Sequence, residues 1–500
     1  MPLTRPRPVP LPDAPNTRRP WILAAVMAAM AMIAIEATIV STAMPQIAGQ
    51  LGDLDLYAWV FAAFLLTQTA TTVVFGKLSD LYGRRPVLLL GIAAFLAGSL
   101  LCGLAWSMPS LIVFRLVQGV GAGAIQPVGL TVVGDLYTAR ERGRIQGYLA
   151  SVWGVSSVAG PLAGGLVVGH LSWPWIFWCN LPIGVLAAGL FLAFLREDVA
   201  QRPHRIDALG AGLFTAAIAA LMLALTRAGT SLAAALAPAL VFLAAAGLLA
   251  LQERRAPDPM LDVRLWTRRP IAAANAATLL SGMTVIGLTA FLPMYVQGVL
   301  RGSPLVAGFT LTLMVLGWPI GATLAARHFV RFGLRPILLL GAALLPLGAG
   351  AFVALGPATS PAVAGAGSIV MGLGMGFLSN TALVIIQDTV AWAQRGAATA
   401  SNIFARNLGS TLGATALGAV LNHRLTHPDG DAAVSADALR RLLDDPGSLG
   451  AGADAVRSGL QHALHGTFWT VFALALATGL AALLVPRVAL ADAPRERPAG

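Results

Sequence analysis

The sequence predicts an all-α membrane protein with fourteen transmembrane helices, arranged as two six-helix repeats plus two extra central helices. Three observations support this. Of the 500 residues, 57% are hydrophobic and only 11% are charged, whereas soluble domains carry roughly 25% charged residues. Continuous apolar runs of about 20 residues, the length needed to cross a hydrocarbon core of about 30 Å, recur along the whole chain. A segment that follows the second run also returns in the second half of the chain.

The apolar runs show no alternation of apolar and polar residues, so helices are favoured over the strands of a membrane barrel. The predicted spans cover residues 21–43, 57–78, 86–107, 109–133, 145–169, 180–195, 207–226, 232–251, 271–297, 304–326, 335–356, 361–386, 396–421 and 466–486. The first run is longer than the apolar region of a signal peptide. We therefore expect it to remain as an uncleaved first helix.

The positive charges predict the orientation of these helices. Most of the 33 Lys and Arg residues fall on the side that carries both termini, which is the pattern of cytoplasmic loops. We therefore expect a multi-pass protein of the inner (plasma) membrane with cytoplasmic N- and C-termini. The net charge of +11 is explained by this pattern, so no nucleic-acid partner is expected.

The spans divide the chain into five regions. They are a cytoplasmic N-terminal tail at 1–20, an N-terminal six-helix bundle at 21–200, an extra helix pair with a cytoplasmic linker at 201–270, a C-terminal six-helix bundle at 271–486 with an outer loop at 422–465, and a cytoplasmic tail at 487–500. Histidines at 423, 427, 462 and 465 are too widely spaced for a convincing metal site, so none is expected. Cys102 and Cys179 are both placed near the outer face, and we expect them to stay unpaired.

The internal repeat is carried by "YGRRPVLLLG" at 82–91 and "FGLRPILLLG" at 332–341, which match at most positions. Both segments lead from a short loop into an apolar helix, and the spans around them correspond. Parallel repeats of this kind place a transporter's substrate site between the halves, near the middle of the membrane.

The loop between the second and third spans reads "GKLSDLYGRR" from Gly76 to Arg85. Gly76 allows close approach of a helix, and Gly83 suits a turn that needs positive φ. Asp80 can pair with an arginine or with a helix N-terminus. The loop is either an ordinary basic loop or a charged latch that holds one arrangement of the halves, and Arg84 and Arg85 complete the latch that we predict.

This loop resembles the signature of the major facilitator superfamily, G-x-L-[AS]-D-x-x-G-[RK]-[RK], with every constrained position filled. Other segments resemble motifs of its drug:proton antiporters, namely "RLVQGVGAGA" at 115–124, "SSVAGPLAGG" at 156–165, "WPWIFWCNLPIG" at 173–184 and the stretch from Glu36 to Pro45. The third of these is typical of fourteen-span members. Pro174 and Ser156 depart from the usual residues, but the Gly160–Pro161 pair that marks the antiporters is present.

The resemblance covers essentially the whole chain. It implies a major facilitator-type fold and an antiporter motif formed by Gly160, Pro161, Gly164 and Gly165. It also implies proton-driven multidrug efflux of lipophilic or amphiphilic small molecules, with a proton gradient as energy source, no bound cofactor and a functional monomer. The alternative is an exporter dedicated to one endogenous metabolite, antibiotic or lipid.

Glu36 is the one acidic residue placed deep inside a predicted span, where an ionisable group is expensive and its role is functional by default. At 1.5 Å per residue, Glu36 and Arg115 lie at the same level in the first and fourth spans. Burial raises the proton affinity of a carboxylate, whereas access of water and a nearby cation lower it. We expect Glu36 to carry the proton and Arg115 to be its partner; the alternative is a permanent ion pair that only fixes helix packing.

Further polar residues inside spans are candidates for the substrate cavity. They are Gln118, Gln126, Asn275, Asn380, Asn402 and Arg406. Each of the amides could equally serve as a hydrogen bond between helices, and Arg406 could attract an anionic or zwitterionic substrate.

The sequence contains no P-loop, HExxH or GxSxG motif, so neither ATP hydrolysis nor these enzyme classes is expected. We predict that the chain is not an enzyme and has no catalytic residues. A passive channel and a non-transporting sensor remain the alternatives from other classes.

Overall fold

The computed structural model describes residues 18–51, 56–197, 207–228, 231–256, 263–302, 304–426 and 453–488. Within these ranges the chain is helical. The helices are α1 (Arg19–Leu51), α2 (Tyr57–Tyr82), α3 (Arg84–Gly103), α4 (Met108–Leu136), α5 (Ala139–His170), α6 (Trp175–Trp178), α7 (Asn180–Phe194), α8 (Ala208–Ala228), α9 (Leu232–Arg255), α10 (Val263–Trp266), α11 (Arg269–Gly298), α12 (Pro304–Phe332), α13 (Leu334–Val353), α14 (Pro361–Thr389), α15 (Arg395–Thr426) and α17 (Ala453–Leu483), with a 3-10 turn at Trp392–Gln394.

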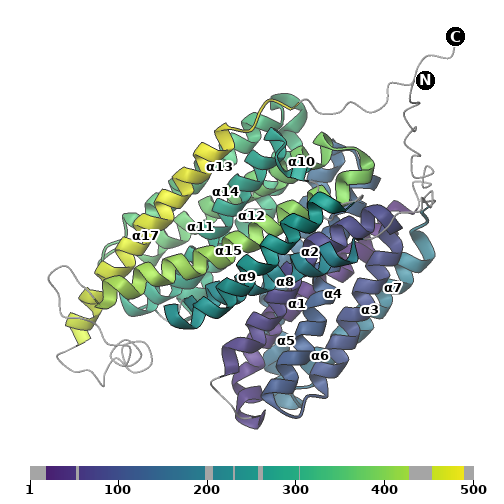
Figure 1. The fold of residues 1–500 in the computed structure, drawn as a ribbon. Coiled ribbons are helices and arrows are strands. Elements are labelled where there is room, and N and C mark those ends of the chain that lie inside the picture. The colour runs from purple at the N-terminus through teal and green to yellow at the C-terminus, as the bar shows by residue number, and fades with distance from the viewer. Residues whose placement is uncertain are drawn as a thin grey trace, which may run out of the picture.

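The helices form two bundles with separate cores. Helices α1 to α7 make the N-terminal half, and α11 to α17 make the C-terminal half (Figure 1). A large apolar cluster fills the C-terminal half, and two clusters fill the N-terminal half. The two sets of helices lie side by side and diverge toward the lower left of Figure 1.

Twelve helices in the described ranges are long and apolar enough to cross a membrane. Helices α5 and α15 coincide with the predicted spans 145–169 and 396–421 but are not among these twelve. Both lie at the boundary between the halves, where α5 packs along α12 and α15 packs along α2. Helices that face protein rather than lipid can carry more polar side chains, so the count of fourteen crossings stays a prediction.

The repeated segment has the same backbone in both halves. Gly83 has φ 95° and separates α2 from α3, and Gly333 has φ 79° and separates α12 from α13. These are the two glycines with positive φ among the described residues, a conformation that side chains with a Cβ rarely adopt. The shared turn geometry supports a structural repeat as well as a repeated sequence.

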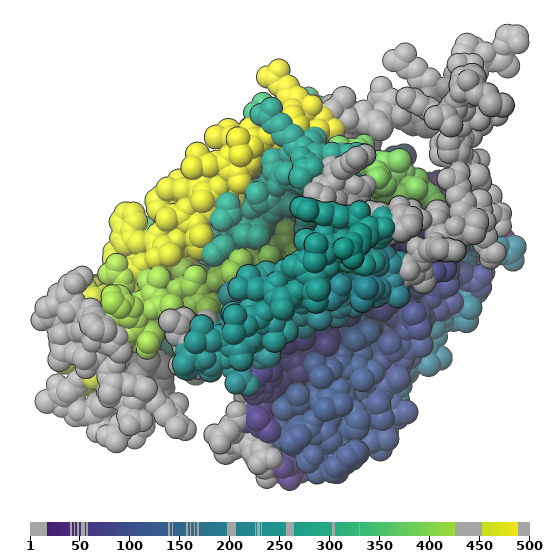
Figure 2. Space-filling view, in the orientation of Figure 1, coloured from purple at the N-terminus to yellow at the C-terminus, as the bar shows by residue number. Residues whose placement is uncertain are grey.

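The extra pair, α8 and α9, lies over the boundary between the halves (Figure 2). Phe214, Ile218 and Met222 of α8 share an apolar cluster with residues of α2 and with Phe404 of α15. Helix α9 is attached mainly to α8 and stays mostly exposed. The pair therefore covers one side of the seam, with α8 in contact with both halves.

The predicted outer loop at 422–465 is shorter than expected. Helix α15 continues to Thr426 and α17 begins at Ala453, so both helices extend beyond the predicted apolar spans. The intervening residues 427–452, including His427, lie outside the described residues. Cys102 and Cys179 are both free thiols.

Glycines let neighbouring helices touch backbone to backbone inside each half. A Cβ at Gly121 of α4 would lie 2.3 Å from the backbone nitrogen of Phe95 and 2.5 Å from the carbonyl oxygen of Gly91, both on α3. Backbone atoms cannot move aside as a side chain can. In contrast, a Cβ at Gly189 of α7 would meet nothing within 4 Å.

Gly121→Ala should therefore destabilise the N-terminal half by about 1–3 kcal/mol, because the added methyl group forces α3 and α4 apart. Gly189→Ala is the matched control and should be neutral or slightly stabilising. Thermal unfolding of the purified variants in detergent measures the difference. Equal melting temperatures for the two variants would contradict this account of the packing.

Candidate functional site

One end of the molecule is closed by contacts between the two halves. We call it the latch face and define it by the turns between α2 and α3, α4 and α5, and α14 and α15. The N-terminus of α1 lies at this end, because Tyr137, directly after α4, donates a hydrogen bond to the carbonyl oxygen of Arg19 at 3.1 Å. The sequence predicts that the latch face is cytoplasmic.

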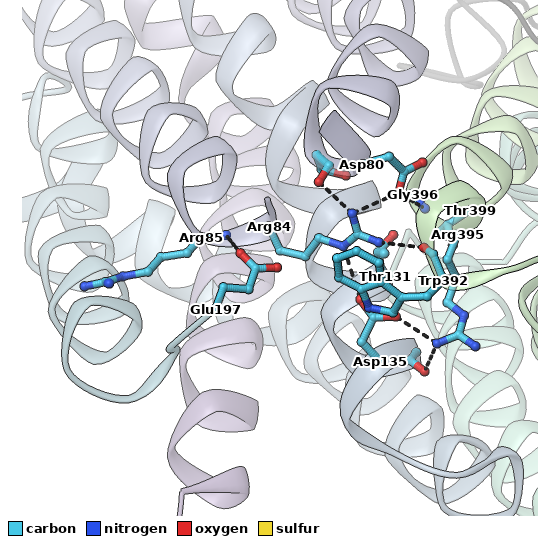
Figure 3. Close-up of polar contacts among 12 residues, drawn as sticks. Asp80, Arg84, Arg85, Thr131, Asp135, Glu197, Trp392, Arg395, Gly396 and Thr399 are labelled. Atoms are coloured by element: carbon cyan, nitrogen blue, oxygen red, sulfur yellow. Dashed lines mark hydrogen bonds and ion pairs between the residues drawn. The ribbon is translucent and has the colours of Figure 1, made fainter. Parts of the chain in front are cut away.

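Arg84 lies at the centre of the latch face and is 1% exposed (Figure 3). Its guanidinium contacts Asp80 at 2.9 Å and Asp135 at 3.1 Å, both within the N-terminal half. It also donates to the carbonyl oxygen of Trp392 in the C-terminal half at 3.0 Å and lies 4.4 Å from the centre of that indole ring. Arg84 therefore joins the two halves.

The carboxylate of Asp80 binds the first turn of α15. It accepts hydrogen bonds from the backbone N–H groups of Gly396 at 2.9 Å and Ala397 at 2.8 Å. A helix N-terminus has unpaired N–H groups and a partial positive charge, so this is a favourable place for a carboxylate. A Cβ at Gly76 would lie 2.3 Å from the Ala400 Cβ, which shows how closely α2 approaches α15 here.

Arg85 belongs to the other side of the turn. Its backbone N–H donates to Glu197 at 2.9 Å, and its guanidinium donates to the carbonyl oxygen of Leu192 at 2.9 Å. Figure 3 shows its side chain pointing away from the Arg84 cluster. Burial raises the pKa of Glu197, against the opposing effect of the N–H donors of Arg85 and Arg84. Arg85 thus fastens α3 to the end of α7, within the N-terminal half.

Two further ion pairs cross between the halves in a reciprocal way. Asp135, at the end of α4, pairs with Arg395, the first residue of α15, at 2.8 Å. Arg142, near the start of α5, pairs with Asp388, near the end of α14, at 2.7 Å. Three of these four side chains are less than 10% exposed, and Arg395 is 17% exposed. Each half contributes one acid and one arginine at corresponding places in the repeat.

The sequence analysis missed this reciprocal arrangement. The signal was present as an Asp followed seven residues later by an Arg, in "DLYTARER" and again in "DTVAWAQR", each after the fourth span of its repeat. Recognising it requires alignment of the two halves beyond the repeated ten-residue segment. Gln387 adds a further contact, since its amide donates to the carbonyl oxygen of Leu130 at 3.2 Å.

Glu36 and Arg115 form an ion pair inside the N-terminal half. Glu36 is 0% exposed and Arg115 is 2% exposed. Arg115 also donates to the amide oxygen of Gln118 at 2.8 Å and to the carbonyl oxygen of Val60 at 3.1 Å, and it lies over the ring of Phe64. The pair therefore ties α1, α2 and α4 together at the level that the sequence predicted.

Asn180 is a second partner of Glu36 that the sequence analysis did not assign. Its amide donates to the other carboxylate oxygen at 2.5 Å, and it is wholly buried at the start of α7. It lies in the "WPWIFWCNLPIG" segment, whose resemblance to a family motif does not by itself predict a contact with Glu36. Both oxygens of Glu36 are thus occupied by donors from different helices.

The candidate cavity residues fall into two groups. Gln118 joins the Glu36 network and donates to Ser99 at 2.8 Å, and Asn402 bonds with Asn275 at 3.1 Å and Thr278 at 2.9 Å. Asn380 donates to the carbonyl oxygen of Ala322 at 3.0 Å. These four amides connect helices in this conformation. Gln126 and Arg406, in contrast, form no hydrogen bond or ion pair with the described residues. A cavity role stays a prediction for all six.

The motif at 160–165 lies on α5 where this helix crosses α1. A Cβ at Gly160 would overlap the hydroxyl of Thr38, which donates to the carbonyl oxygen of Ser156 at 3.0 Å. Thr38 is two residues beyond Glu36. Gly164 is buried on the same helix, and Pro161 and Gly165 also lie within α5. The motif therefore sets the contact between the helix of the buried acid and a helix of the seam.

Two repeated bundles joined by a charged latch, with buried charges inside the spans, define the class of multi-pass membrane transporters. The family model described as Major Facilitator Superfamily matches residues 26–414. The chain belongs to the major facilitator superfamily, has its fold, and is a multi-span membrane protein with small-molecule substrates.

Relatives agree with this assignment. Multidrug transporter protein MdtP of Bacillus subtilis (strain 168) is 32% identical over 416 residues, covering 82% of this chain and 77% of that protein. Multidrug resistance protein 3 of the same strain is 31% identical over 475 residues, covering 91% and 92%. The structure of the human organic anion transporter MFSD10 (TETRAN) has a TM-score of 0.63 at 17% identity, covering 92% of this chain and 99% of that chain, and shares the fold. The family and these relatives are transporters, not enzymes.

Arg115→Gln should destabilise the protein by about 3–5 kcal/mol, because it leaves the Glu36 carboxylate buried without its cation. The double variant Glu36→Gln/Arg115→Gln should recover most of that loss, since neither side chain is then charged. Thermal unfolding in detergent at neutral pH measures both. The ion pair would not be the reason if the double variant were as unstable as Arg115→Gln.

Exchanging the charges of one reciprocal pair tests the latch. Asp388→Arg places two arginines together and should open the latch face, whereas Arg142→Asp/Asp388→Arg should close it again. The readout is maleimide labelling of Thr399→Cys, a position that is 0% exposed on α15, in a background with Cys102 and Cys179 replaced. Lys77→Gln, a change of charge on α2 outside these pairs, is the control and should leave labelling slow. Slow labelling of the Asp388→Arg single variant would contradict the latch.

Proposed function

We propose that the protein is a proton-driven exporter of lipophilic or amphiphilic small molecules that works by alternating access as an antiporter. The observation that carries the proposal is the buried Glu36–Arg115 pair in a transmembrane bundle. The two Bacillus relatives, a multidrug transporter and a multidrug resistance protein, support the multidrug efflux part. The location we propose is the plasma membrane, with both termini in the cytoplasm.

A buried carboxylate is suited to coupling because its two protonation states prefer different surroundings. The charged form requires Arg115 and Asn180, which occupy its two oxygens. A protonated Glu36 would no longer attract Arg115 electrostatically, so the network that joins α1, α2, α4 and α7 would lose its main charge interaction. Proton binding would thus favour a different arrangement of these helices.

The motif on α5 offers a physical route from this acid to the boundary between the halves. Helix α1 contacts α5 through Thr38 and Gly160, and α5 contacts α12 through Gly147 and Thr323. A change in the position of α1 would therefore alter the packing of α5 against α12. Interfaces of this kind respond by switching between discrete packings.

The latch supplies the second requirement of alternating access, which is a closed arrangement of one face. With the proposed orientation, the closed face is cytoplasmic and the conformation is outward-facing. Opening toward the cytoplasm would then break both reciprocal pairs and the contacts of Asp80 with α15. No P-loop occurs in the sequence, which supports the proton gradient as the energy source.

The competing explanation is that Glu36 and Arg115 form a permanent ion pair that only holds helices together. Both explanations predict that the charged pair is buried in this conformation. They differ in whether the acid must exchange its proton during transport, so the test has to separate binding from gradient-driven transport.

Glu36→Gln should retain binding of a lipophilic dye but lose at least tenfold in transport driven by a pH gradient, because an amide cannot carry a proton. The measurement is dye counterflow and gradient-driven uptake in proteoliposomes that contain the purified variant. Asp207→Asn, which changes a carboxylate to an amide at the start of α8, is the control and should keep both activities. Full gradient-driven transport by Glu36→Gln would overturn the coupling role.

A further inference from the structure

We infer that α15 and α4 form a binding site for the anionic group of an amphiphilic substrate, with Arg406 as its main contact. This inference rests on the proposed export function and adds the chemical class of the substrate. The site consists of Arg406, Asn407 and Ser410 on α15 and Gln126 on α4, and we call these four residues the polar patch.

Arg406, which is partly buried, differs from the other buried or partly buried arginines at the latch and beside Glu36. Arg84, Arg115, Arg142 and Arg395 each pair with at least one carboxylate. Within the part of the chain that the structure describes, Arg406 has no ion pair and no hydrogen bond. It is 11 residues from the start of α15, or about 16 Å along the helix, which places it near the middle of the membrane. A cation at this depth normally has a partner.

The other members of the polar patch are also unpaired. Among the described residues, the side chains of Asn407, Ser410 and Gln126 form no hydrogen bond. This is unusual for Ser410, because the hydroxyls of Thr411 and Thr415 on the same helix donate to carbonyl oxygens one turn back. Buried or partly buried polar groups are normally satisfied by protein, water or ligand, so these side chains are available to a ligand.

The register of α15 shows where the polar patch faces. Ile403, Arg406, Asn407 and Ser410 follow the spacing of one helix face. Ile403 lies at the latch and packs into the core of the N-terminal half together with Leu130 of α4. The next turn of the same face is only partly buried, so the polar side chains begin one turn beyond this core contact.

The remaining faces of α15 are occupied by other helices. Phe404 packs against Phe214 of α8, with ring centres 5.9 Å apart. Gly409 and Gly413 lie against the backbone of α11 at Leu279 and Met283. Gly282 of α11 also lies against the backbone of Arg406 and Ser410, so Arg406 stands at the α11 edge of its face. The face as a whole, which continues that of Ile403, is directed toward the N-terminal half.

Gln126 occupies the corresponding place on the opposite helix. It lies one turn of α4 away from Leu130, whose carbonyl oxygen accepts the latch hydrogen bond from Gln387. Two helices of different halves thus present unpaired polar side chains just beyond the same contact layer. Parallel-repeat transporters place their substrate at this level, between the halves.

The donors of the polar patch fit an anion better than a cation. A guanidinium presents five N–H donors in a planar fork that matches a carboxylate or phosphate, and the two amides and the hydroxyl can add neutral donors. The described spans of the C-terminal half contain two carboxylates, and both already have partners. Asp388 pairs with Arg142 at the latch, and Asp454, in the first turn of α17, pairs with Arg301 and Arg457. A substrate that carries a carboxylate would supply the missing counter-charge.

The test compares two probes that share one chain and differ in the charge of its end group, 11-(dansylamino)undecanoate and its uncharged methyl ester. Binding to the full-length protein in detergent is followed by dansyl fluorescence. We expect the native protein to prefer the carboxylate by tenfold or more and Arg406→Gln to lose this preference, because the charge-assisted contact is removed. Arg406→Lys should retain part of it. Arg301→Gln, which removes an exposed arginine outside the polar patch, should leave the preference unchanged.

The inference is overturned if the native protein binds both probes equally or if Arg406→Gln keeps the preference for the carboxylate. It is also overturned if the preference is present in phosphatidylcholine nanodiscs and disappears in phosphatidylglycerol nanodiscs, since a lipid headgroup would then be the occupant. Asn407→Ala keeps the test decisive if the Arg406 variants do not fold, with an expected loss of about threefold in the carboxylate preference.

Binding in detergent needs no pH gradient, so its failure can be distinguished from failure of the proposed function. Loss of the carboxylate preference in Arg406→Gln together with a normal proton requirement supports both proposals. The same loss in a protein whose transport ignores the pH gradient supports the anion site and overturns the proton coupling.

Discussion

The closed arrangement of this transporter depends on buried ion pairs that cross between its two halves. Asp135 with Arg395 and Arg142 with Asp388 are related by the internal repeat, so each half offers the same acid and the same cation to the other. Separation of the halves would leave Arg395, Arg142 and Asp388 without their partners, and Asp135 would keep only its contact with Arg84. Because a charge without a partner is strongly disfavoured away from water, the pairs allow the closed face or a fully hydrated open face, and they disfavour intermediate arrangements.

The repeat is not complete at the latch, and the departure has a structural consequence. Asp80 and Arg84 of the first copy correspond to Val330 and Leu334 in the second copy. The seam between α2 and α15 therefore has carboxylate contacts to a helix N-terminus, whereas the seam between α5 and α12 has close glycine contacts such as Gly147 with Thr323. Close glycine contacts occur at both seams, since Gly76 of α2 lies against Ala400 of α15, so the carboxylate contacts of Asp80 are what distinguish the first seam. The extra helix α8 lies against the charged seam and contacts both of its helices.

Helix positions, the repeat and the ion pair of Glu36 with Arg115 could be predicted from the sequence, because they follow from apolar run length, local similarity and depth in the membrane. The partners across the seam could not. Asp388 and Asp135 are separated from their arginines by 246 and 260 residues, and only the packing of the halves brings them together. The contact of Asn180 with Glu36 could not be predicted for the same reason, since it depends on how α7 packs against α1. The C-terminal end of α15 and the N-terminal end of α17 could not be predicted from the apolar runs, because both helices continue beyond the apolar residues.

The buried charges of the described spans differ in how they are neutralised, and this difference organises the proposed cycle. At the latch, Arg142, Asp388 and Arg395 are neutralised by the opposite half, so their pairing depends on the arrangement of the halves. Glu36 is neutralised within one half by Arg115, so only a proton can release it without leaving a charge in the core. Arg406 has no neutralising group among the described residues, and in our proposal the substrate supplies one. A substrate anion at Arg406 and a proton at Glu36 would then act on opposite halves. The anion would neutralise Arg406, and the proton would neutralise Glu36. The latch would couple the two binding events, because its ion pairs depend on the relative position of the halves.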